Sequence, residues 1–448
     1  MVMRFLVTVA VLITACAHAP INTRLERSLD AAEVNRERPL PTRCTRDVVI
    51  VLSFSGGGVR AAALAYGVLE VLARTRFEAG DGPHRLLDNV TLITSVSGGS
   101  FPAAYYGQYG DRIFEDFERR FLKGHVGRQL SLRLANPINW IRLLSRSFGR
   151  SDLAAELYDD VLFHGATFGD VNARPGPLIA IQATDVIEGS RLGFSAHTFG
   201  LLCSDVATYP LASAVAASAA FPVVFSPVYL RNYAGSCDYG EPTWMREAMT
   251  EGPAAGRRFR NARYLHTYAD TAARPWIPLV DGGVADNLGL HRVFDAISER
   301  KSVRELLRVR GIPDVRRLAF IVVNAQAAPS ARWGIANAAP GLVATLDAVT
   351  SVQVNRYNFE TLELLRRSLA DFRQEWADPT AIDTYVVEVS FDQLADDAER
   401  RALAGLPTAF DLPDEEIDHL RGAAERILTG SPEFRRLLSS LGAALSVE

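Results

Sequence analysis

Between residues 48 and 60 the chain reads Val48-Val49-Ile50-Val51-Leu52-Ser53-Phe54-Ser55-Gly56-Gly57-Gly58-Val59-Arg60. Its first five residues are apolar and mostly β-branched, which favours a buried strand. Helical spacing of apolar residues follows over Ala61–Arg74, so the three glycines form a strand-to-helix turn. Because a helix N-terminus has free backbone N–H groups, this turn is predicted to bind an anion.

Two more strands of this kind end in residues whose side chains can take part in a reaction. The apolar run Val90–Thr94 leads into Ser95-Val96-Ser97-Gly98-Gly99-Ser100 and then into helical spacing. A tight turn of this type exposes the Ser97 hydroxyl at its tip, which is the geometry of a nucleophile elbow. A third strand ends at Leu279-Val280-Asp281-Gly282-Gly283 and supplies a carboxylate. Serine, backbone N–H donors and a carboxylate are together the groups that acyl transfer requires.

In this order the three turns resemble the patatin-like phospholipase family, which has a glycine-rich turn followed by arginine, a Gly-x-Ser-x-Gly elbow and an Asp-Gly-[Ala/Gly] turn. The resemblance covers Asp47 to Gln326 and includes two further blocks, Ala217–Pro222 and Ala183–Phe194. The chain departs from the family pattern at Ser95, where the elbow has serine in place of its first glycine. The alternating strands and helices and the resemblance imply a three-layer α/β/α sandwich with a mainly parallel central sheet.

The resemblance also implies a role for each site residue. Ser97 is expected to be the nucleophile, and Asp281 the base that activates it without an intervening histidine. The N–H groups of Gly56–Gly58 are expected to form the oxyanion hole, and Arg60 to support it. A carboxylate with a solution pKa of about 3.9 is a weak base at neutral pH, so we expect Asp281 to be partly desolvated. This set of residues requires no metal and no cofactor.

The same residues allow two other interpretations. The spacing Gly56-x-Gly58-x-x-Ala61 fits a dinucleotide-binding fingerprint, but the next strand ends in Thr94-Ser95 and lacks the acidic residue that would bind the ribose. A triad of Ser97, Asp281 and His291 follows the chain order of α/β-hydrolases. Against the triad, His291 lies close in sequence to Asp281, within an expected helix.

The predicted function is a serine acyl hydrolase with a Ser-Asp dyad, namely a phospholipase A or lysophospholipase that acts on membrane lipid esters. An esterase or transacylase would use the same residues. A non-enzymatic lipoprotein that keeps the fold and binds lipid or protein is the alternative class, although the intact site counts against it. The expected partners are a lipid ester and a membrane surface. Nucleic acid is not expected, because the net charge is −4 and no basic stripe with interleaved aromatic residues is present.

The N-terminus has the pattern of an export signal. Arg4 precedes the apolar run Phe5–Ile13, which is long enough for a signal-peptide core and too short to span a bilayer. Ile13-Thr14-Ala15-Cys16 resembles a bacterial lipobox, in which Cys16 becomes lipidated after cleavage. This predicts an anchor in the bacterial cell envelope, at the outer membrane or the periplasmic face. Ala17-His18-Ala19 also fits an ordinary cleavage site, with secretion as the alternative.

The length of 448 residues is expected to hold one large α/β domain with additions. The expected units are a signal peptide over 1–15, a tether over 16–46, a catalytic domain over 47–330 and an α/β extension over 331–448 packed on the same domain. Within the catalytic domain, residues 231–275 are expected to be an insertion that overhangs the site.

The cysteines fit an oxidising compartment. If Cys16 carries lipid, then Cys44, Cys203 and Cys237 allow one internal bridge and one free thiol. We expect the bridge to join Cys203 to Cys237, because both flank loops. No Cys/His spacing indicates a zinc site.

One amphipathic segment has two interpretations. Residues 129–148 combine Ile138, Trp140, Ile141 and several leucines with arginines. Such a segment forms either a helical hairpin that covers the core or an interfacial element that lies on lipid.

Overall fold

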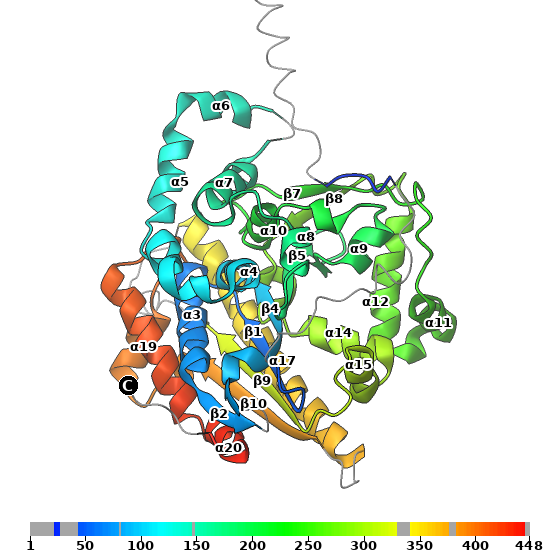
Figure 1. The fold of residues 1–448 in the computed structure, drawn as a ribbon. Helices are drawn as coiled ribbons and strands as arrows, with labels where there is room; N and C mark the ends of the chain where they lie inside the picture. The colour runs from blue at the N-terminus through cyan, green and yellow to red at the C-terminus, as the bar shows by residue number, and fades with distance from the viewer. Residues whose placement is uncertain are drawn as a thin grey trace, which may run out of the picture.

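The computed structural model describes residues 22–26, 44–79, 82–145, 148–328, 341–375 and 382–443. Its centre is an eight-stranded sheet in the order β10-β9-β1-β4-β5-β8-β7, with β6 paired to β5 (Figure 1). The strands are β1 (Val48–Phe54), β4 (Val90–Val96), β5 (Leu178–Asp185), β6 (Ser190–Gly193), β7 (Val228–Arg231), β8 (Trp276–Val280), β9 (Arg317–Asn324) and β10 (Asp383–Ser390). The five strands from β10 to β5 are parallel, whereas β6 and β8 run antiparallel to β5. The predicted mainly parallel α/β sheet is therefore confirmed.

The sheet is covered on both faces, and β1 shows why. Every residue of β1 is buried. Ile50 and Leu52 pack into the apolar cluster on one face, whereas Val49 and Val51 pack into the cluster on the other, because successive strand residues point to opposite faces. The first face is covered by α3 (Gly58–Arg74), α4 (Ser100–Tyr109), α10 (Leu211–Ser218), α19 (Asp414–Gly430) and α20 (Pro432–Ser440), and the second by α14 (His291–Arg300), α15 (Val303–Val309) and α17 (Leu342–Glu375).

The C-terminal part of the chain contributes to the same sheet. Strand β10 pairs with β9 along its whole length, from Asp383 opposite Arg317 to Ser390 opposite Asn324. Helix α19 then packs along α3 (Figure 1). Gly67 allows this close approach, because a Cβ atom there would lie 2.8 Å from the Cβ of Ala424.

Smaller elements surround this sandwich. They are β2 (Arg76–Ala79), β3 (Gly82–Arg85), α5 (Val126–Ala135), α6 (Pro137–Leu143), α7 (Arg150–Tyr158), α8 (Phe168–Asn172), α9 (Ala196–Leu201), α11 (Thr243–Glu251), α12 (Arg257–His266), α13 (Gly283–Asp286) and α18 (Asp397–Ala404). Among the described helices, none combines the length and the apolar character needed to cross a bilayer.

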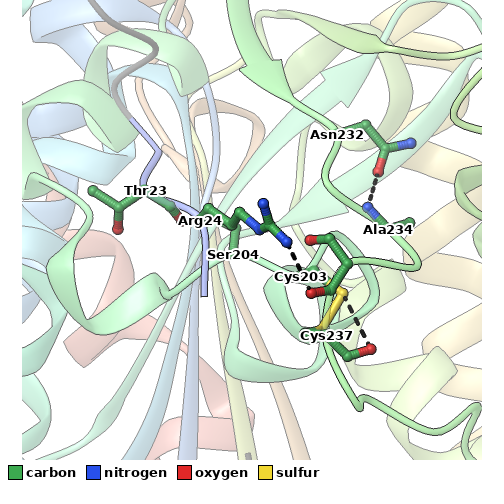
Figure 2. Close-up of a disulfide and its surroundings, with 8 residues drawn as sticks. Thr23, Arg24, Cys203, Ser204, Asn232, Ala234 and Cys237 are labelled. Atoms are coloured by element: carbon green, nitrogen blue, oxygen red, sulfur yellow. Dashed lines mark hydrogen bonds between the residues drawn. A yellow bond between two sulfur atoms is a disulfide. The ribbon is translucent and has the colours of Figure 1, made fainter. Parts of the chain in front are cut away.

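Residues 22–26, which fall inside the expected tether, lie against the loop after α9 (Figure 2). The N–H of Leu25 donates to the carbonyl of Cys203 over 2.9 Å, and Arg24 donates to the carbonyl of Ser236 over 3.2 Å. The disulfide between Cys203 and Cys237 joins the two loops that receive this segment, with Cα atoms 5.6 Å apart. The expected pairing is confirmed. Residues 1–21, with the expected leader and lipidation site at Cys16, lie outside the described residues.

Candidate active site

The first half of the site is the glycine turn between β1 and α3. Gly57 has φ 137° and Gly58 has φ 63°, in the region that favours glycine. A Cβ atom at Gly58 would lie 2.3 Å from the carbonyl oxygen of Ala409. Both the backbone conformation and the close contact therefore require glycine at residue 58.

The N–H groups of this turn differ in what they bind. The N–H of Gly56 donates to the carbonyl of Asn287 over 3.2 Å, so it does not point freely into the site as the sequence led us to expect. Across the described part of the chain, no hydrogen bond takes the N–H of Gly57 or Gly58. These two groups remain as donors for a bound anion.

The second half is the turn at Ser97, between β4 and α4. Ser97 has φ 50°, a left-handed conformation that is uncommon for a residue with a side chain. Strain of this kind accumulates at functional sites and is a feature of nucleophile elbows. A Cβ atom at Gly98 would lie 2.1 Å from the carbonyl oxygen of Gly58, so the two turns touch through their backbones. Ser95 is fully buried, which shows that the elbow accommodates serine in place of glycine.

Asp281, immediately after β8, completes the arrangement. Ser97 Oγ donates a hydrogen bond of 2.7 Å to Asp281 Oδ2, and the N–H of Gly283 donates to Oδ1 over 2.8 Å. Burial raises the pKa of Asp281 to about 6, even though both hydrogen bonds act in the opposite direction. The carboxylate is thus a stronger base than in water while most of it stays ionised at neutral pH.

Ser218, at the end of α10, is a supporting residue that the sequence analysis did not single out. Its hydroxyl accepts the N–H of Ser97 over 2.9 Å and donates to the carbonyl of Gln182 over 2.6 Å. Its carbonyl accepts the N–H of Gly282 over 3.0 Å. Ser218 therefore connects the elbow, β5 and the Asp281 turn. Its position inside the small-residue block 217–222 was the available signal.

Arg60 lies behind the glycine turn and is buried. Its Nε donates to the carbonyl of Ala325 over 3.1 Å, and its Nη2 donates to Thr408 Oγ1 over 3.2 Å. The guanidinium thus fixes two loops that frame the site, which agrees with a supporting role. Its positive charge also lies near Gly57, since a Cβ atom there would be 3.2 Å from Nη2.

His291 has other partners than the site. Arg257 donates to His291 Nδ1 over 3.0 Å, and His291 Nε2 is 2.9 Å from the hydroxyl of Tyr357. Because Nδ1 accepts a hydrogen bond from a cation, the imidazole is neutral. Burial and the Arg257 charge lower its pKa to about 4. The structure does not bring His291 to the Ser97 hydroxyl, and no triad forms.

A pocket of about 80 Å³ opens at the dyad. Its lining includes both reacting side chains together with Gly57, Phe221 and Val284. No described lining residue comes from 231–275, so the expectation that this region overhangs the site is wrong. That region instead borders a cavity of about 860 Å³ along β5 and β6, which contains neither Ser97 nor Asp281. Within the described residues, no cluster of His, Cys, Asp or Glu side chains is arranged to hold a metal ion.

The chain is similar to a known family in sequence and to solved proteins in structure. A sequence model described as patatin-like phospholipase matches residues 52–294. Among solved structures, human GIVD cytosolic phospholipase A2 is similar at 12% identity and a TM-score of 0.45, covering 89% of this chain and 62% of that one. VipD from Legionella pneumophila is similar at 13% identity and a TM-score of 0.24, covering 90% of this chain and 71% of that one. The chain thus spans less than two thirds of the human enzyme's length. No curated protein matches it in sequence.

Proposed function

The chain belongs to the patatin-like phospholipase family, and we propose that it is a serine acyl hydrolase of the phospholipase A or lysophospholipase type with Ser97 as nucleophile and Asp281 as base. The observation that carries this proposal is the hydrogen bond of 2.7 Å from Ser97 Oγ to a buried carboxylate. Family membership supports a lipid ester as the substrate.

The proposed reaction has two stages. In the first, Ser97 Oγ attacks the ester carbonyl while Asp281 takes the hydroxyl proton. The oxyanion that forms lies against the N–H groups of Gly57 and Gly58, whose donation in acyl transfer is worth about 2.7–4 kcal/mol each. Collapse of the tetrahedral intermediate breaks the ester C–O bond, and the leaving alcohol receives the proton from Asp281. In the second stage water attacks the acyl-serine with Asp281 again as base, which releases the fatty acid and restores Ser97.

The lining of the pocket supports an apolar acyl group. Phe221, Val284 and Val354 contribute to its wall, and its ionisable lining residues are Asp281 and Arg60. The guanidinium of Arg60 donates to the carbonyls of Ala325 and Leu406. An acyl chain that approaches Ser97 can therefore contact three apolar side chains, which favours its transfer from water. The lining also includes uncharged polar side chains, among them Asn287, Gln326 and Asn355.

The proposal is tested by incubating the purified protein with phospholipids that differ in headgroup and in acyl position. We expect release of fatty acid by the natural protein, loss of this release after treatment with a fluorophosphonate, and no release by Ser97→Ala. Release by Ser97→Ala equal to that of the natural protein contradicts the proposal. A protein that binds lipid but releases no fatty acid from any member of the panel supports the non-enzymatic alternative.

We also propose that the protein is a lipoprotein of the bacterial cell envelope, anchored through Cys16. The lipobox pattern supports this location, and so does the disulfide between Cys203 and Cys237, because disulfides persist in oxidising compartments. Bacteria fed a labelled fatty acid should label the natural protein and not Cys16→Ala. Normal processing and release of Cys16→Ala would instead support cleavage after Ala19 and secretion.

A further inference from the structure

The hairpin of α5 and α6 has an unusual charge for this chain. Residues 119–151 contain eight arginines and lysines and no aspartate or glutamate, whereas the whole chain has a net charge of −4. Three of these cations, Arg128, Arg133 and Arg142, lie on the two helices, and Arg150 begins α7. Arg133 pairs with Asp160 and Arg142 with Glu156, so these two charges are partly balanced by acidic residues that follow the hairpin. A segment this basic attracts an anionic partner.

The same hairpin presents apolar side chains to solvent. Five of them are more than half exposed, namely Leu132, Ile138, Trp140, Ile141 and Leu144. Figure 1 shows α5 leading away from the body of the molecule, with α6 at its outer end. The alternative that this segment covers the core is therefore wrong for α6. Exposed apolar groups gathered on one projecting element mark an interaction surface.

Both ends of the hairpin are attached to segments that frame the candidate active site. At its start, the N–H of Gly127 donates to Asp411 over 2.9 Å, three residues after the pocket-lining Thr408. Beyond its end, Arg150, the first residue of α7, donates to the carbonyl of Val223 over 2.9 Å, two residues after the pocket-lining Phe221. Both attachments thus lie within three residues of the pocket lining.

The mouth itself has an apolar rim. Val284 lines the pocket, and Val223 and Val224 follow shortly after the lining residue Phe221; all three valines are about half exposed. Val223 has φ 74°, which is a rare conformation for a β-branched residue. The fold therefore keeps the Val223 side chain exposed at the entrance even though its backbone conformation is unfavourable.

We propose that the exposed residues of α5 and α6 and the valine rim form one docking face that seats the protein on an anionic lipid bilayer. This proposal rests on the proposed function, because a lipid ester must leave a bilayer to reach Ser97. Tryptophan and arginine side chains suit the headgroup level, and isoleucine and leucine suit the acyl boundary below it. The exposed apolar residues also distinguish this face from one built for nucleic acid, where charge and hydrogen bonding dominate.

The test compares the natural protein with the triple variant Ile138→Ser/Trp140→Ser/Ile141→Ser. Binding is measured by flotation with vesicles of phosphatidylcholine alone and with vesicles of equal parts phosphatidylcholine and phosphatidylglycerol. Every form carries the same N-terminal segment, so its contribution to binding cancels. A matched control is Val309→Ser on α15, an exposed apolar position on the opposite face of the sheet.

We expect the natural protein to bind the anionic vesicles more strongly, with binding weakened by salt. The triple variant should lose about tenfold or more of this binding, while Val309→Ser keeps it. Hydrolysis of a soluble short-chain ester should be the same in all forms. Unchanged binding by the triple variant, equal loss in Val309→Ser, or equal binding to both vesicle types overturns the proposal. Vesicle binding that responds as expected without any ester hydrolysis supports the docking face and contradicts the proposed enzyme function, so the two failures are distinguishable.

Discussion

Ser97 and Asp281 flank β5 on opposite sides, and their side chains meet at the level of one β5 residue. Val96 pairs with Gln182 across the parallel β4–β5 ladder, and Val280 pairs with Thr184 across the antiparallel β5–β8 ladder. One residue further along either strand reaches the level of Ala183. The antiparallel direction of β8 thus delivers the carboxylate to the serine, and the distance between the two side chains depends on the register of both ladders.

The dyad predicts a specific ranking of variants. Ser97→Ala should lower kcat for a soluble p-nitrophenyl ester by about a thousandfold or more, and Asp281→Asn by a comparable factor, because the two residues act as a unit. His291→Ala should cost less than about tenfold, because its partners are Arg257 and Tyr357. Steady-state kinetics on the three variants test this ranking. A loss of kcat in His291→Ala equal to that in Asp281→Asn would instead support a triad that includes His291.

The pKa of Asp281 predicts a pH profile. The base must be ionised, and burial raises its pKa to about 6. The value of kcat/KM for the soluble ester should therefore fall by about tenfold per pH unit below pH 6 and level off above pH 7. A profile that stays flat down to about pH 4.5 would show that Asp281 titrates as an ordinary carboxyl or is not the base.

The same shift predicts a cost in stability. Because the folded-state pKa lies above the unfolded value, ionisation disfavours the folded state, and the penalty develops as the pH rises from 3.8 through about 6. Asp281→Asn removes this penalty and should raise the free energy of unfolding by at most about 3 kcal/mol near pH 8. The gain should disappear near pH 3, where the carboxyl is mostly neutral in both states. Denaturant unfolding at the two pH values measures it, and a gain of equal size at both contradicts the electrostatic explanation.

Much of this arrangement followed from local sequence pattern. Strands β1 and β4 begin at Val48 and Val90, where the apolar runs begin, and Ser97 and Asp281 lie where strands end, as expected. Two features depend on contacts between distant segments and left no local pattern. The antiparallel direction of β8 is set by its pairing with β5, and the N–H of Gly56 is taken by Asn287, far along the chain.

The helices α5 and α6 illustrate the other limit of sequence analysis. Apolar residues at helical spacing predict a helix, but the same pattern fits a helix that covers a core and one that projects from it. Gly127 and Arg150 attach the two sides of the hairpin, and Arg142 pairs with Glu156 of α7, which leaves Trp140 and Ile141 exposed on α6 at the outer end. Contacts between the hairpin and the rest of the fold decide which of its apolar residues are exposed, and the spacing of apolar residues does not reveal these contacts.

We expect Ser218 to position Ser97 rather than to take part in the reaction. Ser218→Ala leaves the N–H of Ser97 and the carbonyl of Gln182 without their buried partner, which should cost about 1–3 kcal/mol of stability. With the elbow less firmly held, kcat should fall by about tenfold with little change in KM. Ser213→Ala, on the same helix and also buried, is the control and should change kcat little. Equal losses in the two variants would show that Ser218 acts only in packing.

We expect substitution of Val223 by asparagine to raise stability and to lower activity on lipid vesicles. Asparagine tolerates the left-handed conformation better than valine does, so Val223→Asn should raise the free energy of unfolding by about 1 kcal/mol. The same change removes an apolar side chain from the rim, and hydrolysis of lipid in anionic vesicles should fall several-fold while hydrolysis of a soluble ester stays the same. Lys301→Asn is the control, because Lys301 also has a left-handed backbone, with φ 59°, but is not part of the docking face. That variant should not lower vesicle hydrolysis. If Val223→Asn loses vesicle and soluble activity in parallel, the valine supports the pocket itself and not the contact with the bilayer.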